Sequence, residues 1–193
     1  MRTVLHFLWQ ASLFVLALLI GPVMSPRSVA DTVILYVNAN VQGGAGDGTS
    51  WSDAYPFLQD ALADAAANAG EEQLYQIWVV GGAEPNPVIY YPDRDADNEE
   101  GSCNSEKGCD PTATFELHDH VELYGGFTGS ESDLGQRAPL QNITVLSGLL
   151  DDDPEVRAYH VVTANGIAAT ARLDGFFIED GDGLQQDRLA AAC

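Results

Sequence analysis

Basic residues are scarce in this sequence. The chain of 193 residues carries 8 Lys and Arg against 29 Asp and Glu, a formal net charge of −21, and Lys107 is its single lysine. Nucleic acids and anionic membrane surfaces attract proteins chiefly through Lys and Arg. The shortage therefore excludes nucleic-acid binding and docking on anionic membranes.

Long apolar runs are also missing. No stretch reaches the roughly 18 uninterrupted apolar residues that a membrane-spanning helix needs, so we expect no transmembrane span in the mature chain. With 46% hydrophobic and 19% charged residues, the chain is nevertheless too apolar for wholesale disorder. Its length favours one domain.

Residues 1–30 have the pattern of a secretory signal peptide. Arg2 supplies the charged start, the run Leu13–Ile20 is wholly apolar, and Ser28-Val29-Ala30 offers the small residues of a cleavage site. We predict export and cleavage after Ala30, with an uncleaved N-terminal anchor as the alternative. Removal of this segment leaves 29 acidic and 6 basic residues, a net charge of −23.

Cysteine is rare, and its spacing is informative in an exported chain. Cys103 and Cys109 are separated by five residues in a polar stretch, whereas Cys193 stands at the last position. Oxidising compartments favour disulfides, so we predict a bond between Cys103 and Cys109. The alternative is a zinc site completed by His118 and His120.

One segment has helical periodicity. Apolar residues recur at helical spacing from about Ala54 to Ala69 and form one stripe. We expect Ser52 or Asp53 to cap this helix and Gly70 to follow its end. It is the one convincing helix in the sequence.

The remaining pattern is one of short β-type runs separated by Gly, Asp and Asn. Several are nearly continuous in apolar residues, as in strands of parallel sheets. An all-β body follows from these runs and the absence of helices between them. The expected strands are residues 33–37, 76–80, 114–117, 121–124, 143–146, 159–163 and 172–178.

A polar insertion, residues 81–113, separates two of these runs. Its densest acidic part places Asp93, Asp95 and Asp97 at alternate positions. Calcium binds six to eight oxygen ligands, and three such carboxylates supply part of that set. We predict a calcium site at these three residues; the alternative is a solvated acidic loop.

Six segments resemble the opening of a known family. They read ILYVNANVQGGAGDGTSWSDAYPFLQDALADAA, QIWVVGG, TFELHDHVELYGGFTGSESDLGQR, ITVLSG, YHVVTANG and ARLDGFFIEDGDG. In this order they are similar to secreted bacterial proteins of the polymorphic outer membrane protein and pectin-lyase-like type. The resemblance spans about residues 33–183.

This resemblance implies a right-handed parallel β-helix that begins within residues 31–183. The alanine-rich helix would be its N-terminal cap, with Leu58 and Leu62 facing the first coil, because the open end of a solenoid needs a cover with one polar face. Residues 184–193 depart from the family pattern, and the chain looks like a truncated N-terminal portion. Trp51 and Trp78 would pack in the core or cap.

The resemblance also implies a location and a role. We expect an exported protein at the bacterial cell surface or outer membrane, a structural or adhesion-type module without catalytic activity of its own. Surface polysaccharide or cell-envelope components would be its partners. The alternative is a fragment of a polysaccharide lyase or hydrolase, which would show carboxylates and a basic residue stacked on successive strands of one sheet face.

Overall fold

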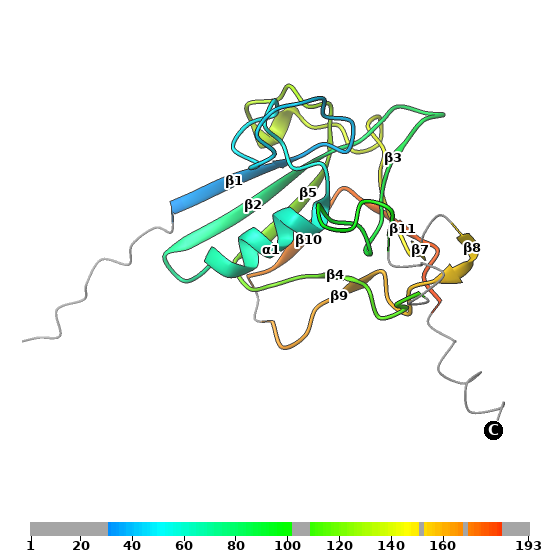
Figure 1. Ribbon diagram of the computed structural model, residues 1–193. Coiled ribbons are helices and arrows are strands. Elements are labelled where there is room, and N and C mark those ends of the chain that lie inside the picture. Colours follow the sequence, from blue (N-terminus) through cyan, green and yellow to red (C-terminus); the bar gives the residue numbers. More distant parts are fainter. Residues whose placement is uncertain (1–30, 102–108, 151–152, 168–169, 183–193) are drawn as a thin grey trace, which may run out of the picture.

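The structure is a computed structural model that describes residues 31–101, 109–150, 153–167 and 170–182. The predicted signal peptide, the atypical tail 184–193 and Cys103 lie outside the described residues. Within them the chain is mostly strands with a single α-helix (Figure 1), which confirms the all-β class. The helix α1 has 11 residues, about half the length that crossing a membrane requires, and no described helix is long and apolar enough to do so.

Three parallel sheets make up the body. The first has the order β1 (Asp31–Val37), β2 (Gln73–Val80), β5 (Val121–Phe127) and β10 (Arg172–Asp174). The second has the order β11 (Phe177–Glu179), β6 (Thr144–Ser147) and β3 (Val88–Tyr90). The third pairs β4 (Phe115–Glu116) with β9 (Val162–Thr163). A short antiparallel pair, β7 (Leu149–Leu150) and β8 (Asp153–Arg157), projects beside them.

The chain visits the three sheets in a repeated order. After β1, it passes through β2, β3 and β4, then through β5, β6 and β9, and finally through β10 and β11. We call these stretches the first, second and third passage. Each strand of the second and third passages pairs in parallel with the equivalent strand of the passage before it, and β2 pairs in the same way with β1. Neighbours in a sheet are therefore far apart in sequence.

Side chains that point inward form continuous rows across these passages. In the first sheet Leu35, Ile77, Leu123 and Leu173 occupy one register position. Side chains alternate between the two faces of a strand, so residues one position away point outward. Ile77 and Leu123 are fully buried, because each has a neighbour on both sides.

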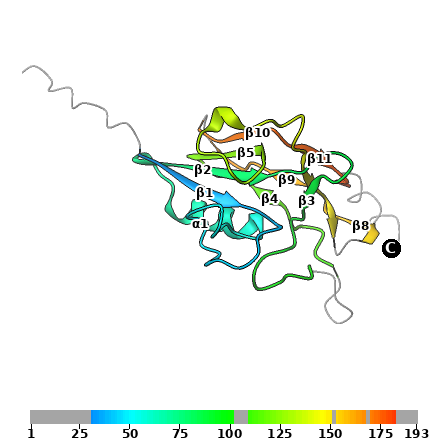
Figure 2. The same ribbon diagram turned by 90° about the horizontal axis from the view of Figure 1, so that it is seen from above.

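The helix α1 (Leu58–Asn68) covers the start of the body. It packs against β1, β2 and β4, and Figure 2 shows it on the side opposite β10 and β11. Its buried residues are Leu58, Ala61, Leu62 and Ala65, which repeat at the helical period. Leu58 and Leu62 are thus on the buried face of α1, which packs against these strands; that the strands form the first coil of a β-helix stays a prediction.

The start of this helix differs from the prediction. The helix begins at Leu58 with Phe57 as its N-cap, and no side chain caps it. Asp53 instead accepts hydrogen bonds from the Ala45 N–H (2.9 Å) and the Ser50 hydroxyl (2.8 Å). Its carboxylate therefore closes the glycine-rich turn that precedes the helix. Hydrogen bonds within the turn thus compete with capping of the helix for the same acceptor.

Two strand predictions also need correction. The run 172–178 is two strands, β10 and β11, because Gly175 has a φ of +85° and turns the chain from the first sheet into the second. The insertion 81–113 contains β3, whose three residues include the inward-pointing Val88 and Tyr90. A strand this short leaves too few residues for an alternating pattern to stand out.

Candidate functional site

Six polar or charged side chains gather on the outer face of the first sheet. We call this group the outer-face cluster: Gln76, Glu122, Tyr124, Arg137, Arg172 and Asp174. Gln76, Glu122 and Arg172 occupy one register position of β2, β5 and β10. Because the first sheet is parallel and in register, residues 46 and 50 positions apart in the sequence become direct neighbours.

Glu122 is held by neutral donors. Its Oε2 accepts hydrogen bonds from the Gln76 amide and from the Tyr124 hydroxyl, both at 2.9 Å. The other end of the Gln76 amide accepts a bond from the Trp78 indole N–H at 3.2 Å. The carboxylate is thus built into a chain of polar contacts that crosses two strands.

Asp174 is held by two guanidinium groups. Its carboxylate lies 2.6 Å from Arg137 and 3.1 Å from Arg172. Arg137 also donates to the carbonyl oxygen of Gly125 at 3.2 Å. A Cβ at Gly175 would lie 2.6 Å from the Arg137 guanidinium, so the glycine leaves the space that this arginine occupies.

The pKa shifts follow from these contacts. Burial, and then the hydrogen bond to Glu122, raise the pKa of the Tyr124 hydroxyl, so it stays protonated at neutral pH. The hydrogen bond from Arg137 lowers the pKa of Asp174 below its ordinary value of 3.8, which makes this carboxylate a weaker base. Two carboxylates face two guanidinium groups, and the charges of the cluster balance internally.

We expect Asp174→Asn to destabilise the protein by about 1 kcal/mol at pH 7, since a charge-assisted bond in a half-exposed site contributes about that much. The folded-state pKa of Asp174 lies below its unfolded value, so its contribution is present above pH 3.8 and fades as the pH falls through the folded pKa. Urea unfolding of wild type and variant should therefore differ at pH 5 and converge only as the pH falls below 3.8. Glu179→Gln, at an exposed position of β11, is the matched control; an equal loss there would contradict the prediction.

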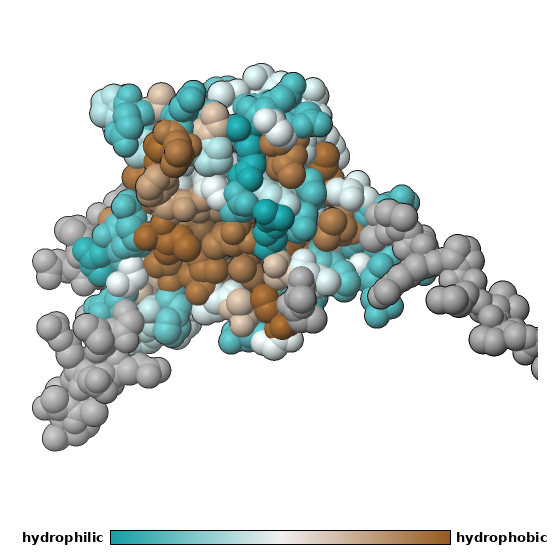
Figure 3. Space-filling view, turned by 180° about the vertical axis from the view of Figure 1, so that it is seen from behind, coloured by the Kyte–Doolittle hydropathy of each residue, from teal (hydrophilic) through white to brown (hydrophobic). Residues whose placement is uncertain are grey.

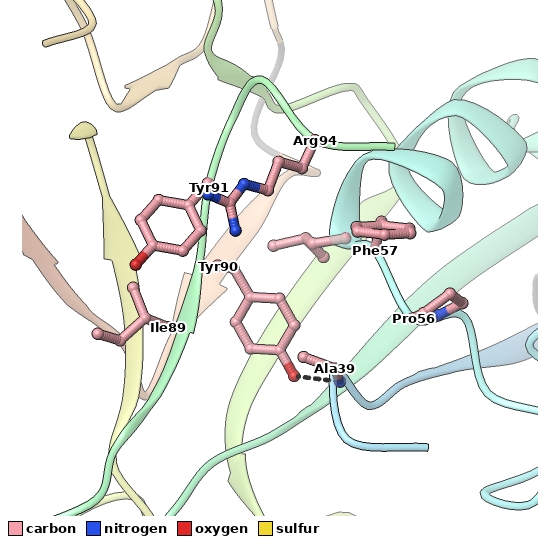
Figure 4. A pocket seen from close by; sticks show the side chains of 8 residues that line it. Ala39, Pro56, Phe57, Ile89, Tyr90, Tyr91 and Arg94 are labelled. Carbon is pink, nitrogen blue, oxygen red and sulfur yellow. Dashed lines mark hydrogen bonds between the residues drawn. The ribbon is translucent and has the colours of Figure 1, made fainter. Parts of the chain in front are cut away.

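The structure also has a small cleft between α1 and β3. Its volume is about 170 Å³ and its lining includes Phe57, Ile89, Tyr91 and Arg94 (Figure 4). The Arg94 guanidinium lies 4.3 Å from the centre of the Tyr91 ring. Ligand pockets commonly measure about 300–1,000 Å³, so the cleft is small for a binding site of its own.

The three aspartates of the calcium prediction lie in a folded loop over the first turn of α1. Asp93 is buried, and the Asp95 carboxylate accepts a bond from the backbone N–H of Asp97 at 2.9 Å. Asp60 of α1 accepts a bond from the Ala96 N–H at 3.1 Å. Burial first, and then the charges of Asp95 and Asp97, raise the pKa of Asp60.

Across the described ranges, no three His, Cys, Asp or Glu side chains are grouped closely enough to hold a metal ion. Calcium binding at Asp93, Asp95 and Asp97 stays a prediction. Mutual repulsion of Asp60, Asp95 and Asp97 opposes folding when all three are ionised. A divalent cation would relieve that repulsion.

If calcium binds here, millimolar calcium should raise the unfolding midpoint relative to chelator, by about 2.7 kcal/mol of stability at a hundredfold excess over Kd. The increment should disappear in the double variant Asp95→Asn/Asp97→Asn. Glu99→Gln/Glu100→Gln removes the same charge from exposed positions of the same loop and should keep it. A midpoint that is indifferent to calcium would leave the solvated acidic loop as the correct interpretation.

Cys109 is disulfide-bonded, and its partner lies outside the described residues. Pairing with Cys103 therefore stays a prediction. Thiol titration of denatured, unreduced protein should find one reactive thiol per chain, that of Cys193. Three thiols would contradict the prediction, and a Cys109→Ser variant should show two.

The aromatic residues near the outer-face cluster have a packing role. The rings of Trp78 and Phe127 stack with centres 4.8 Å apart, and Trp78 is almost fully buried. The Trp51 indole N–H donates to the carbonyl oxygen of Glu131 at 2.8 Å, which ties the glycine-rich turn to the loop after β5. Trp51 and Trp78 therefore pack against other aromatic side chains, as expected.

Comparison of the chain with known protein families, with curated proteins and with solved structures found no match. The interpretation of the site therefore depends on its geometry. Sequence reasoning singled out none of Arg137, Arg172, Glu122 and Asp174. The signal that could have found them is the register of β2, β5 and β10, since only that register makes them neighbours.

Proposed function

We propose that the chain is the start of a right-handed parallel β-helix that serves, after export, as a structural or adhesion-type module of the bacterial cell surface. The observation that carries the proposal is the repeated order in which the chain visits three parallel sheets. Crossovers between parallel strands of one sheet are right-handed in about 98% of cases. The amphipathic α1 over the first strands supports the role of an N-terminal cap.

The ion pairs and hydrogen bonds within the outer-face cluster support a module without catalysis. A general base at neutral pH needs a pKa near the working pH and a free acceptor. Asp174 is paired with two arginines and has a lowered pKa, and the Oε2 of Glu122 already accepts two hydrogen bonds. The cluster resembles a polar ladder that stabilises neighbouring strands.

A polysaccharide lyase or hydrolase is the second candidate, and one observation favours it. Glu122, Asp174 and Arg172 place carboxylates and a basic residue on one sheet face, across successive strands. The Arg172 side chain is 56% exposed, so its N–H groups are open to a carboxylate or hydroxyl group of a sugar. The two candidates therefore differ in whether this cluster acts on a bound polysaccharide.

Export and catalysis are tested separately. The full chain, expressed in a Gram-negative host, should be recovered outside the cytoplasm with Asp31 as its first residue; intact chain in the cytoplasm would refute the exported module. The recovered protein should bind cell-envelope polysaccharide without shortening it, as judged by product size and new reducing ends. Chain cleavage that is lost in Glu122→Gln would establish the enzyme instead.

A further inference from the structure

Aspartate precedes proline at two places in the sequence, Asp110-Pro111 and Asp153-Pro154. A peptide bond of this type is weak in acid, because the aspartate carboxylate can attack the backbone carbonyl of its own residue. The proline nitrogen carries no hydrogen in the peptide, and it leaves once it has taken up a proton. The two bonds have different surroundings, since Asp153 begins the strand β8 whereas Asp110 begins a tight turn before β4.

The turn 110–113 fixes the carboxylate that would attack. Its Oδ1 accepts hydrogen bonds from the Thr112 hydroxyl at 2.6 Å and from the Thr112 backbone N–H at 2.9 Å. Aspartate at the first position and proline at the second are favoured in such turns. A nucleophile whose rotation is restricted beside its target reacts faster than a freely rotating one.

The same hydrogen bonds keep this carboxylate ionised. The bond from the Thr112 side chain, and then the one from its backbone, lower the pKa of Asp110 below the ordinary value of 3.8. An ionised carboxylate is the form that acts as a nucleophile. In acid solution Asp110 therefore retains its nucleophile at a pH where an ordinary aspartate has lost it.

The carbonyl group under attack is polarised by the same turn. The backbone carbonyl oxygen of Asp110 accepts a hydrogen bond from the Ala113 N–H at 3.2 Å. Negative charge develops on this oxygen when the carbonyl carbon is attacked, and a backbone N–H that is already directed at it stabilises that charge. The nucleophile, the carbonyl and the donor thus belong to four consecutive residues.

We propose that the chain cleaves itself between Asp110 and Pro111 in mild acid. A carboxylate oxygen of Asp110 bonds to the backbone carbonyl carbon of the same residue, the C–N bond to Pro111 breaks, and solvent acid supplies the proton to the proline nitrogen. Water then opens the cyclic anhydride that is left on Asp110. This second step restores the side-chain carboxylate and creates a new terminal carboxylate, so water is the one co-reactant.

The fold holds the two products together. The cut falls between β3 and β4, and the parallel pairs β2–β5 and β3–β6 join one side of it to the other. The helix α1, which precedes the cut, packs against β4, which follows it. At the new N-terminus the carbonyl oxygen of Pro111 accepts a hydrogen bond from the Tyr159 N–H at 2.8 Å. The product is therefore a two-chain protein with the fold of the intact one.

The exported chain is incubated at the lowest pH at which circular dichroism shows the native spectrum, and is followed on a reducing, denaturing gel. Two fragments should appear, and N-terminal sequencing should find Pro111 as the first residue of the second, while light scattering shows an unchanged native mass. Cleavage after Asp110 should be about tenfold faster than cleavage after Asp153. Concentrated urea at the same pH should remove this difference, because it unfolds the turn.

Three variants separate the contributions. Asp110→Asn keeps an acceptor for both Thr112 donors, removes the ionised oxygen and should abolish the cut. Asp153→Asn makes the same change at the other aspartate–proline bond and should leave the cut in place. Thr112→Val removes the hydroxyl donor and should slow cleavage about threefold.

Four results would overturn the proposal. They are a folded chain that stays intact in acid, equal rates at the two aspartate–proline bonds, a preference that persists in urea, and a cut that survives Asp110→Asn. Circular dichroism checks that each variant is folded. If Asp110→Asn is not, the rate of Thr112→Val decides, since an unchanged rate would show that the turn takes no part.

Discussion

Leu123→Ala is expected to cost about 3 kcal/mol of unfolding free energy. Leu123 is fully buried in the middle of the row that joins Ile77 to Leu173, so its removal leaves a cavity that neighbours on both sides prevent from collapsing. Buried Leu→Ala changes cost about 2–5 kcal/mol. Urea unfolding followed by far-UV circular dichroism measures the loss.

Leu173→Ala provides the matched comparison. It is the same substitution in the same row, one passage later, but Leu173 is only half-buried. The loss should be about 1 kcal/mol, because solvent already reaches this side chain. Equal losses at the two positions would show that the third passage is covered in the monomer, contrary to the structure.

Leu62→Asp is the second substitution with a large expected effect. Leu62 is 4% exposed and lies on the face of α1 that packs against the strands. A carboxylate there would be buried without a partner, or α1 would detach from the first strands; either outcome should cost about 4 kcal/mol or more. Thermal unfolding should show a strongly lowered midpoint temperature or no cooperative transition.

Ala63→Asp serves as its control. Ala63 is the next residue of the same helix and lies on the exposed face, so the substitution adds the same charge and a similar loss of helix propensity. That propensity difference is below about 1 kcal/mol. If both variants unfolded equally, α1 would be sensitive to charge in general and its role as a cover would be refuted.

Sequence reasoning predicted the elements with strong local patterns. The helix was predicted over 54–69 and is found at Leu58–Asn68, because its apolar stripe repeats over three turns. Strands β1, β2 and β5 have long β-branched and aromatic runs and lie where they were expected. Such patterns act within a few residues and need no knowledge of the rest of the chain.

The features that were missed depend on distant parts of the chain. The outer-face cluster exists because parallel pairing aligns Gln76, Glu122 and Arg172, and no local pattern encodes that register. β3 was hidden in a polar insertion because three residues carry no periodicity. Ser52 or Asp53 was expected to cap the helix, but the Asp53 carboxylate accepts its hydrogen bonds from the preceding turn instead, because either set of donors satisfies it.

The chain passes through the three sheets in a repeated order, and this order has a consequence for folding during synthesis. Every parallel strand pair joins a passage to the one synthesised before it. When a strand leaves the ribosome or a translocation channel, the strand with which it pairs has thus already been synthesised. No strand has to wait for a later segment before it can pair with an earlier one. The molecule can grow in the direction of its own synthesis, with α1 closing the oldest end while the newest edge is still being formed.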